Sequence, residues 1–322
     1  MTRITCPQCR YQNRQSARYC AACGYEFAAP PIQIDDDLPT RPSGSPIGDN
    51  DLTEGEGGML AQVSYTLRVG RLSDIGRERE SNEDSTLAVE LHCGNRSINR
   101  GAGLFVVADG MGGHEGGEIA SGMLVRSLAR VAAAEWLPSV IDAKEQLLDT
   151  GAWLISAIQR ANAEIYDWAQ EAGYEMGTTV VAALIAGNHV LVAHVGDSRA
   201  YRVSATGLEQ LTVDHSLVES LVMTNQISRE EARTHPQANV IYRTIGDQPQ
   251  VIVDLADIEL AAGDRLLLCS DGLSGMLADN VIAKIVMAEL SPQAACEALI
   301  LAANKAGGED NCSVIVVELN SP

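Results

Sequence analysis

The chain has few basic residues for its size. Its 322 residues include 23 lysines and arginines against 43 acidic residues, which gives a net charge of −20 at pH 7. A protein that binds the phosphate backbone of nucleic acid needs clustered basic side chains, so this balance excludes a large nucleic-acid footprint. An acidic body instead suits a protein that collects divalent cations.

Long hydrophobic runs are also absent. No apolar stretch approaches the roughly 18 residues that a transmembrane helix needs, and the first residues, MTRITC, lack the apolar core of a signal peptide. The sequence contains no P-loop, no kinase signature and no serine nucleophile elbow. We therefore expect a soluble, cytoplasmic protein without a membrane segment, whose chemistry does not use those three motifs.

Two cysteine pairs near the N-terminus have the spacing of a zinc site. Cys6 and Cys9 form one CxxC motif, and Cys20 and Cys23 form a second one after ten intervening residues. Four thiolates at this spacing suit one structural zinc ion with tetrahedral sulfur ligands. Two disulfides or a redox-active CxxC are the alternatives, but no secretion signal or βαβ pattern accompanies them. We predict a zinc ribbon over residues 1–27 that docks another protein or caps the terminus.

Residues 28–62 have the composition of a flexible linker. They contain several prolines and glycines, three consecutive aspartates at Asp35–Asp37 and hardly any large apolar side chains. Such a segment cannot bury enough surface to offset its ordering entropy. We predict a disordered, acidic linker here, followed by one catalytic domain over residues 63–322, where short apolar alternations begin.

Periodicity and capping residues outline some elements of this domain. Apolar spacing of three and four predicts helices over 118–135 and 146–171, and two apolar runs over 177–186 and 190–195 predict a hairpin. Asp279 is expected to cap a helix that reaches Leu290. Ser291 and Pro292 are expected to open a second helix, which ends at Gly307.

An apolar strand followed by a glycine-rich turn forms the centre of the predicted site. Leu104–Ala108 is apolar throughout, as expected for a strand buried on both faces, and it is followed by Asp109. Five glycines among the next eight residues allow the backbone to approach a ligand closely. Asp-Gly is also a common way to make a tight turn, so this stretch alone leaves a plain turn as the alternative.

Further acids recur in similar places along the chain. Three aspartates lie beside strand-like segments, and two acids share a polar stretch with an arginine; these residues are Asp197, Asp271 and Asp310, and Glu83, Asp84 and Arg79. The polar stretch read alone is also compatible with a solvated loop. Carboxylates gathered at one rim need cations, and oxygen-only ligands favour Mg²⁺ or Mn²⁺ over zinc. A pair of such ions about 3.5–4 Å apart is suited to hydrolysing phosphate esters.

Six short motifs, taken together and in order, resemble a known family. They are RxxNED at 79–84, VADGMGG at 107–113, GTT at 177–179, GDSR at 196–199, CSDGL at 269–273 and DN at 310–311. The set resembles the bacterial form of the metal-dependent serine/threonine protein phosphatases of the protein phosphatase 2C (PP2C, PPM) family, over about residues 65–320. The resemblance implies an α+β fold, a four-layer α-β-β-α sandwich of two antiparallel sheets flanked by helix pairs, with the metals at one end.

The resemblance also implies a metal ligand at each matching acid. Asp109 resembles the carboxylate that bridges both metals, and the carbonyl of Gly110 would lie on one of them. Asp271 and Asp310 resemble ligands of the other metal. Asp197 matches the residue that, with Asp271, holds a third metal in bacterial members.

Three further matches concern the phosphate and its surroundings. Glu83 and Asp84 match acids that bind a metal or hold its waters, and Arg79 resembles the phosphate-binding arginine. Many eukaryotic members have a histidine, proposed as the general acid, directly after the Asp-Gly pair, where this chain has Met111. His114 then becomes the candidate general acid, with water as the alternative proton donor.

We therefore expect a protein serine/threonine phosphatase that hydrolyses phosphoserine and phosphothreonine esters with water activated by two Mn²⁺ or Mg²⁺ ions, with a possible third. The alternative is a catalytically inert scaffold or signalling protein with the same fold, targeted by its zinc ribbon. Inert relatives usually lose metal aspartates, and none is missing here. The expected partners are phosphorylated substrates of serine/threonine kinases and a protein that binds the ribbon, and the expected oligomeric state is a monomer.

Overall fold

The computed structural model describes residues 65–95, 98–112, 116–141 and 149–320, and near the N-terminus residues 3–5, 7, 10 and 12–14. The chain divides into two compact units, Met1–Gln62 and Val63–Pro322. In the first unit, strand β1 (Arg3–Thr5) pairs antiparallel with β2 (Gln12–Arg14). The four ribbon cysteines and the whole predicted linker lie outside the described residues, so the zinc ribbon and the linker stay predictions.

The second unit is built on two five-stranded antiparallel sheets. The first, here called the β5 sheet, has the strand order β12-β9-β8-β5-β4, with the bounds β4 Ser85–Asn95, β5 Ile98–Ala108, β8 Val180–Ala186, β9 His189–Val195 and β12 Asp254–Glu259. The second, the β14 sheet, has the order β11-β10-β13-β14-β3, with the bounds β3 Thr66–Asp74, β10 Arg199–Ser204, β11 Gly207–Gln210, β13 Arg265–Cys269 and β14 Cys312–Asn320. Strands β8 and β9 form the hairpin that the sequence predicts.

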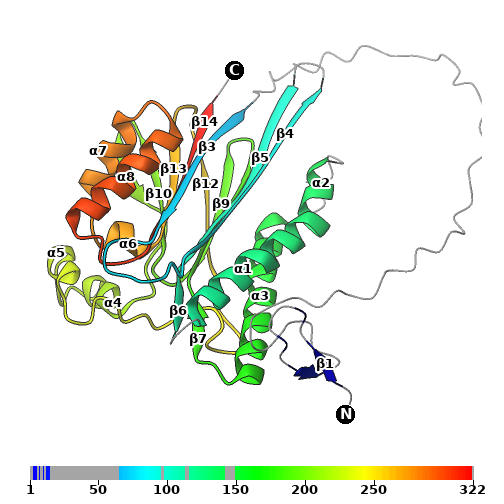
Figure 1. The fold of residues 1–322 in the computed structure, drawn as a ribbon. Helices are drawn as coiled ribbons and strands as arrows, with labels where there is room; N and C mark the ends of the chain where they lie inside the picture. The colour runs from blue at the N-terminus through cyan, green and yellow to red at the C-terminus, as the bar shows by residue number, and fades with distance from the viewer. Residues whose placement is uncertain are drawn as a thin grey trace, which may run out of the picture. The chain divides into compact units, whose positions relative to one another are not determined.

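Side-chain alternation explains how these sheets pack. In β14, Ile315 belongs to the apolar cluster that joins the two sheets, together with Phe105 and Val181 of the β5 sheet. The next residue, Val316, belongs to the cluster on the opposite face, which includes Leu299 of helix α8 (Pro292–Ala306). Because successive side chains of a strand point to opposite faces, one strand contributes to both clusters. The predicted fold of two antiparallel sheets with flanking helices is confirmed, and Figure 1 shows the helices on the outer faces.

The helices that cover the β5 sheet differ in detail from the prediction. Helix α1 (Gly116–Val131) begins two residues earlier than predicted and continues as a π-helical turn (Ala132–Trp136) and a short helix α2 (Leu137–Ile141). Helix α3 (Thr150–Ala172) begins four residues later than predicted, because the Asp149 side chain accepts a hydrogen bond from the Ala152 amide at 3.0 Å and caps the helix there.

On the β14 sheet, one predicted cap is confirmed and one is wrong. The Ser291 hydroxyl accepts a hydrogen bond from the Ala294 amide at 3.2 Å and opens α8, which ends before Gly307 as predicted. Helix α7 (Asp279–Ala288) has Ala278 at its N-cap, so Asp279 is its first helical residue and not its cap. The Asp279 carboxylate instead accepts a hydrogen bond from the Tyr201 hydroxyl at 3.4 Å.

The remaining elements gather at one end of the two sheets (Figure 1). They are β6 (Gly110–Gly112) and its partner β7 (Met176–Thr178), and the short helices α4 (Leu217–Met223), α5 (Arg229–Arg233) and α6 (Asp271–Ser274). Among the described helices, none combines the length and the hydropathy that a membrane span requires.

Candidate active site

Antiparallel pairing brings the predicted acids to one end of the sandwich. Asp84 directly precedes β4 and Asp109 directly follows β5, and the first residue of β4 pairs with the last residue of β5. In the β14 sheet, Asp271 follows the end of β13 and Asp310 precedes the start of β14, and these two strands also pair antiparallel. Asp197 lies in the connection between β9 and β10, which belong to different sheets. The topology therefore places strand ends from both sheets beside one another.

The electrostatics of these aspartates show that they share one environment. Burial, with repulsion from Asp271, Asp84 and Asp197, raises the pKa of Asp109 well above its ordinary value. Burial and the Asp271 charge do the same to the pKa of Asp197. Burial raises the pKa of Asp84 to about 7, and burial with the Asp310 charge raises the pKa of Asp271. These carboxylates can be ionised together only at a free-energy cost, unless cations lie among them.

Several oxygens of this cluster lack protein partners. Asp84 Oδ1, Asp197 Oδ1 and Asp271 Oδ1 are buried and accept no hydrogen bond within the described part of the chain. A buried carboxylate oxygen without a partner is costly, and a divalent cation would satisfy it. Because the donors are all oxygens, the set fits Mn²⁺ or Mg²⁺.

The backbone around Asp109 is held from two sides. The Asp109 amide donates to Thr179 Oγ1 at 3.0 Å, and the Asp109 carbonyl accepts from the Thr179 amide and from Thr178 Oγ1, both at 2.8 Å. Gly110 follows in a tight space, since a Cβ atom there would overlap the carbonyl of Gly117. These two threonines are the GTT motif of the sequence, and their contacts explain why it accompanies the aspartate.

Asn311 organises the loop that carries the predicted phosphate ligand. Its side-chain oxygen accepts a hydrogen bond from the Glu83 amide at 2.8 Å, and its side-chain nitrogen donates to the carbonyls of Ile75 and Ser81, both at 2.9 Å. Arg79 lies between these anchor points. The sequence indicated Asn311 only as part of a motif, because its three partners are over 220 residues away in the chain.

Arg79 itself is paired with one of the predicted ligands. Its Nη2 lies 2.6 Å from Asp310 Oδ2, and about half of its side chain is exposed. Glu83 faces the same rim, and burial raises the pKa of its carboxyl. Met111 is half-buried in β6 at the position after the Asp-Gly pair. His114, the candidate general acid, lies outside the described residues, so that assignment stays a prediction.

His215 holds the residue that precedes Asp197, a role that the sequence did not indicate. The Gly196 amide donates to His215 Nδ1 at 3.0 Å, and the His215 amide donates to the Gly196 carbonyl at 2.9 Å. Gly196 has a φ of +107°, and a Cβ atom there would lie 2.7 Å from Cβ of Thr179. Two hydrogen bonds and the absence of a side chain therefore fix the turn that presents Asp197.

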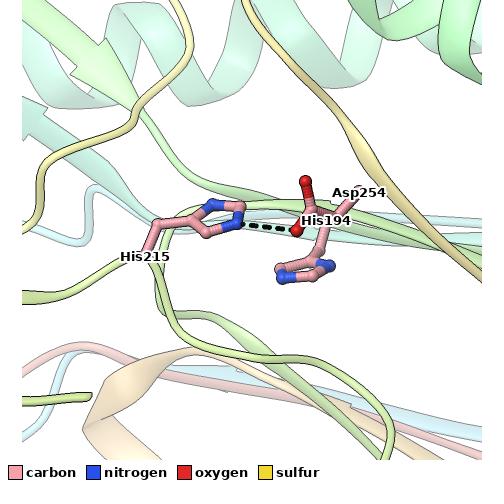
Figure 2. A group of neighbouring side chains, drawn as sticks. All are labelled: His194, His215 and Asp254. Atoms are coloured by element: carbon pink, nitrogen blue, oxygen red, sulfur yellow. Dashed lines mark hydrogen bonds and ion pairs between the residues drawn. The ribbon is translucent and has the colours of Figure 1, made fainter. Parts of the chain in front are cut away.

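The same histidine belongs to a second group of possible metal ligands, drawn in Figure 2. Atoms of His194, His215 and Asp254 all lie within 4.8 Å of one another. His215 Nδ1 accepts from the Gly196 amide, and Nε2 lies 3.3 Å from Asp254 Oδ2 and within hydrogen-bond distance of Arg243, so both ring nitrogens already have protein partners. The guanidinium of Arg243 lies 2.9 Å from His215 Nε2 and 2.7 Å from Asp254 Oδ1, where it would repel a cation.

Ring geometry also argues against a metal at this place. The rings of His194 and His215 stack with centroids 4.7 Å apart and planes inclined by 15°, so their in-plane lone pairs do not converge on one point. Nε2 of His194 lies 2.9 Å from the carbonyl of Val213. His194 is therefore a buried histidine with a hydrogen-bond partner.

Replacing His215 by alanine is expected to lower the free energy of unfolding by about 2 kcal/mol, because the Gly196 amide loses its buried acceptor and the ring leaves a cavity. Asparagine should lose about half as much, since its side-chain oxygen can accept from the same amide. Urea unfolding of both variants measures this difference. The exposed His189, at the start of β9, provides a matched alanine control, and equal losses for the asparagine and alanine variants would contradict the assigned hydrogen bond.

Fold and site together define a class of protein, an α+β sandwich of two antiparallel sheets whose strand ends bring together carboxylates suited to divalent cations. Comparison with known families identifies which family within that class this chain matches. Residues 79–299 match the family "Protein phosphatase 2C". The chain belongs to this family.

Three similar proteins illustrate the relationship. Protein phosphatase PhpP of Streptococcus pneumoniae is 36% identical over 256 residues, which cover 79% of this chain and 98% of that protein. The crystal structure of the Mycobacterium tuberculosis serine/threonine phosphatase PstP/Ppp matches with a TM-score of 0.67 and 36% identity, covering 79% and 99% of the two chains. The catalytic domain of PstP in complex with two manganese ions matches with a TM-score of 0.66 and 34% identity, covering 80% and 100%.

Proposed function

We propose that this chain is a metal-dependent protein serine/threonine phosphatase that hydrolyses phosphoserine and phosphothreonine esters. The observation that carries the proposal is the group of unpartnered carboxylate oxygens on Asp84, Asp197 and Asp271 beside Asp109. An inert scaffold with this fold has no need to retain such a costly cluster. The relatives named as phosphatases, and the PstP domain with two manganese ions, support the same activity.

The proposed metal ligands are the acids that the family resemblance indicates, with one backbone carbonyl; they are Glu83, Asp84, Asp109, Gly110, Asp197, Asp271 and Asp310. When bound, two Mn²⁺ or Mg²⁺ ions would lower the pKa of a water molecule and offset charge on the phosphate. The oxygen donors on both sheets fit two ions better than one, because the acids come from separate strand ends. A third ion between Asp197 and Asp271, as in bacterial members, is part of the proposal.

The chain's own residues would bind the phosphate and supply a proton. The guanidinium of Arg79 lies at the rim and carries several N–H donors. It can release Asp310 and bind phosphate oxygens instead, so that its charge stays paired. His114 is the proposed donor of the proton to the leaving oxygen, since Met111 cannot donate one. Asn311 and the two threonines at 178 and 179 act through the backbones that they hold.

Replacement of Arg79 by lysine should raise the KM for phosphopeptides about tenfold and change kcat less, because lysine keeps the charge but not the bidentate geometry. The Asp310 carboxylate also loses its close partner. Steady-state kinetics on one phosphothreonine peptide measure both constants. Arg68, exposed on β3, is the matched control for arginine-to-lysine exchange, and wild-type KM and kcat in the Arg79 variant would remove this residue from the site.

A direct assay separates the enzyme from the scaffold alternative. The full chain, freed of metal with EDTA, should hydrolyse a phosphothreonine peptide only after Mn²⁺ or Mg²⁺ is added back. Hydrolysis of p-nitrophenyl phosphate should follow the same metal dependence. Failure of both reactions at every metal concentration would favour the inert scaffold.

The N-terminal region completes the proposal. We propose a zinc ribbon over residues 1–27 with Cys6, Cys9, Cys20 and Cys23 as ligands, a disordered linker over 28–62 and the phosphatase domain over 63–322. The ribbon would bind a protein partner and direct a monomeric, cytoplasmic enzyme to substrates of serine/threonine kinases in signal transduction. Structural zinc fits four thiolates with this spacing.

Elemental analysis tests the zinc proposal. The full-length protein should contain one zinc per chain, and a chain lacking residues 1–62 should contain none while it hydrolyses short phosphopeptides at nearly the wild-type rate. The binding energy of the zinc is the folding energy of so small a module, so replacement of Cys6 and Cys9 by serine should remove the zinc as completely as truncation. Absence of zinc from the full-length protein would overturn the ribbon.

A further inference from the structure

A cavity of about 370 Å³ opens beside the candidate active site. Three segments that are distant in sequence line it, namely β6, the stretch from the end of α3 into β7, and the segment 244–247. The side chains that give it its character are Met111, Tyr174, Glu175, Thr244 and Asp247. None of the metal-ligand candidates lines it, so it is a separate site next to the phosphate position.

The cavity lies close to Asp109 along the chain. Strand β6 begins at Gly110, directly after Asp109, and Met111 pairs with Gly177 across the β6–β7 ladder. Extended backbone advances about 3.3 Å per residue, so the cavity lies about two residues from Asp109. A substrate whose phosphorylated side chain reaches Asp109 would place a neighbouring side chain at this cavity.

The lining selects a cation with a flat, partly apolar body. Glu175 and Asp247 contribute two exposed carboxylates, and none of the described residues that line the cavity is basic. Within the described part of the chain, Glu175 makes no ion pair, and the Asp247 carboxylate accepts only a 3.3 Å hydrogen bond from the Gln248 side chain. Tyr174, 37% exposed, packs its ring against Trp168 with centroids 5.7 Å apart. A guanidinium can pair with carboxylates and stack on such a ring at the same time.

We propose that this cavity binds an arginine side chain of the phosphoprotein substrate, within a few residues of the phosphorylated serine or threonine. The inference rests on the proposed phosphatase function and deepens it, since it gives the enzyme a sequence preference. Charge complementarity identifies the occupant, because two unpaired carboxylates and an aromatic ring suit arginine better than an apolar or acidic side chain.

The test uses the full chain with Mn²⁺ and a set of phosphothreonine peptides. Arginine is placed in turn at each of the three positions on either side of the phosphothreonine, and each peptide is compared with its citrulline counterpart, which has nearly the same shape without the charge. At one or more positions, kcat/KM should be about fivefold higher for arginine, the size expected for two solvent-exposed ion pairs. The preference should decline in 1 M salt, which screens exposed charges.

The double variant Glu175→Gln, Asp247→Asn should lose this preference. Glu171→Gln is the matched control, because Glu171 is exposed on α3 near the cavity but does not line it, and it should keep the preference. Hydrolysis of p-nitrophenyl phosphate, which is too small to reach the cavity, should be the same in all three proteins.

The possible failures are distinguishable. If no protein hydrolyses p-nitrophenyl phosphate or any peptide with metal present, the proposed function is wrong. If all the peptides are hydrolysed but arginine is not preferred to citrulline, or if the double variant keeps the preference, the arginine site is wrong and the phosphatase assignment stands. A peptide with norleucine in place of arginine gives one more test. A higher kcat/KM for the norleucine peptide would also overturn the arginine site, because the cavity would then be an apolar site.

Discussion

Exchange of Asp109 for asparagine is expected to lower kcat on p-nitrophenyl phosphate and on phosphopeptides by at least about a thousandfold. This residue lies among the other aspartates and is the proposed ligand of both ions, so its charge is needed to hold them. Asparagine keeps the size of the side chain and its hydrogen-bonding oxygen. The loss should therefore reflect metal binding and not the fold.

The same substitution should stabilise the protein in EDTA. Burial, with repulsion from Asp271, Asp84 and Asp197, raises the pKa of Asp109, and a neutral side chain avoids both costs of the charge. Thermal unfolding in EDTA, and a titration of Mn²⁺ against the unfolding temperature, measure both effects. Asp257→Asn, exposed on β12, is the matched control. Activity near the wild-type value in the Asp109 variant, or a large loss of metal-free stability, would contradict the assigned place of Asp109.

Local signals in the sequence predicted which strand ends carry the acids. The apolar run Leu104–Ala108 is the last part of β5, and it delivers Asp109 to the sheet end as expected. The recurrence of the pattern at Asp197, Asp271 and Asp310 indicated a shared rim, which the antiparallel pairing of their strands produces. A strand end is a local feature, and sheet topology then collects several of them.

The sequence failed where a contact joins distant segments. Asp279 precedes an apolar helical pattern and has the residue type of a cap, yet its carboxylate pairs with the hydroxyl of Tyr201, which the sequence places 78 residues earlier. A tertiary contact overrides the local capping preference here.

The roles of Asn311 and His215 were missed for the same reason. Each is a polar residue whose side chain holds a backbone amide of another segment, Glu83 for Asn311 and Gly196 for His215. Nothing in the neighbouring sequence identifies such a partner. The only available signal was position, since Asn311 follows Asp310 directly and lies at the start of a strand.

Metal removal should reverse the usual dependence of stability on pH. Burial raises the pKa of Asp84 to about 7 and the pKa values of Asp109 and Asp197 well above the ordinary value. A carboxyl whose pKa is raised in the folded state binds its proton more tightly there than in the unfolded chain. Its stabilising contribution is complete below the unfolded pKa and is lost as the pH rises through the folded pKa.

The two buried histidines change the free energy of unfolding with pH in the opposite direction, so the measurement must avoid the pH range in which they titrate. Burial lowers the pKa of His194 and His215, so their contribution is lost as the pH falls below the ordinary histidine value. Measurements between about pH 7 and pH 8.5 lie above that range. At the start of this interval Asp84, whose pKa is about 7, still holds part of its proton, whereas the carboxyls of the unfolded chain hold almost none.

In EDTA, the free energy of unfolding should therefore fall between about pH 7 and pH 8.5, by at most about 2 kcal/mol for each aspartate, a limit that only a group protonated throughout the interval reaches. With saturating Mn²⁺ the fall should disappear, because the cations replace the protons and bind the ionised carboxylates more tightly as the pH rises. Urea unfolding at both pH values, with EDTA and with Mn²⁺, measures the effect. The Asp109→Asn variant should show a smaller fall in EDTA than the wild type. A metal-free protein whose stability is constant or rises over this interval would show that the aspartates are not close enough to repel one another, and the two-ion site would lose its physical basis.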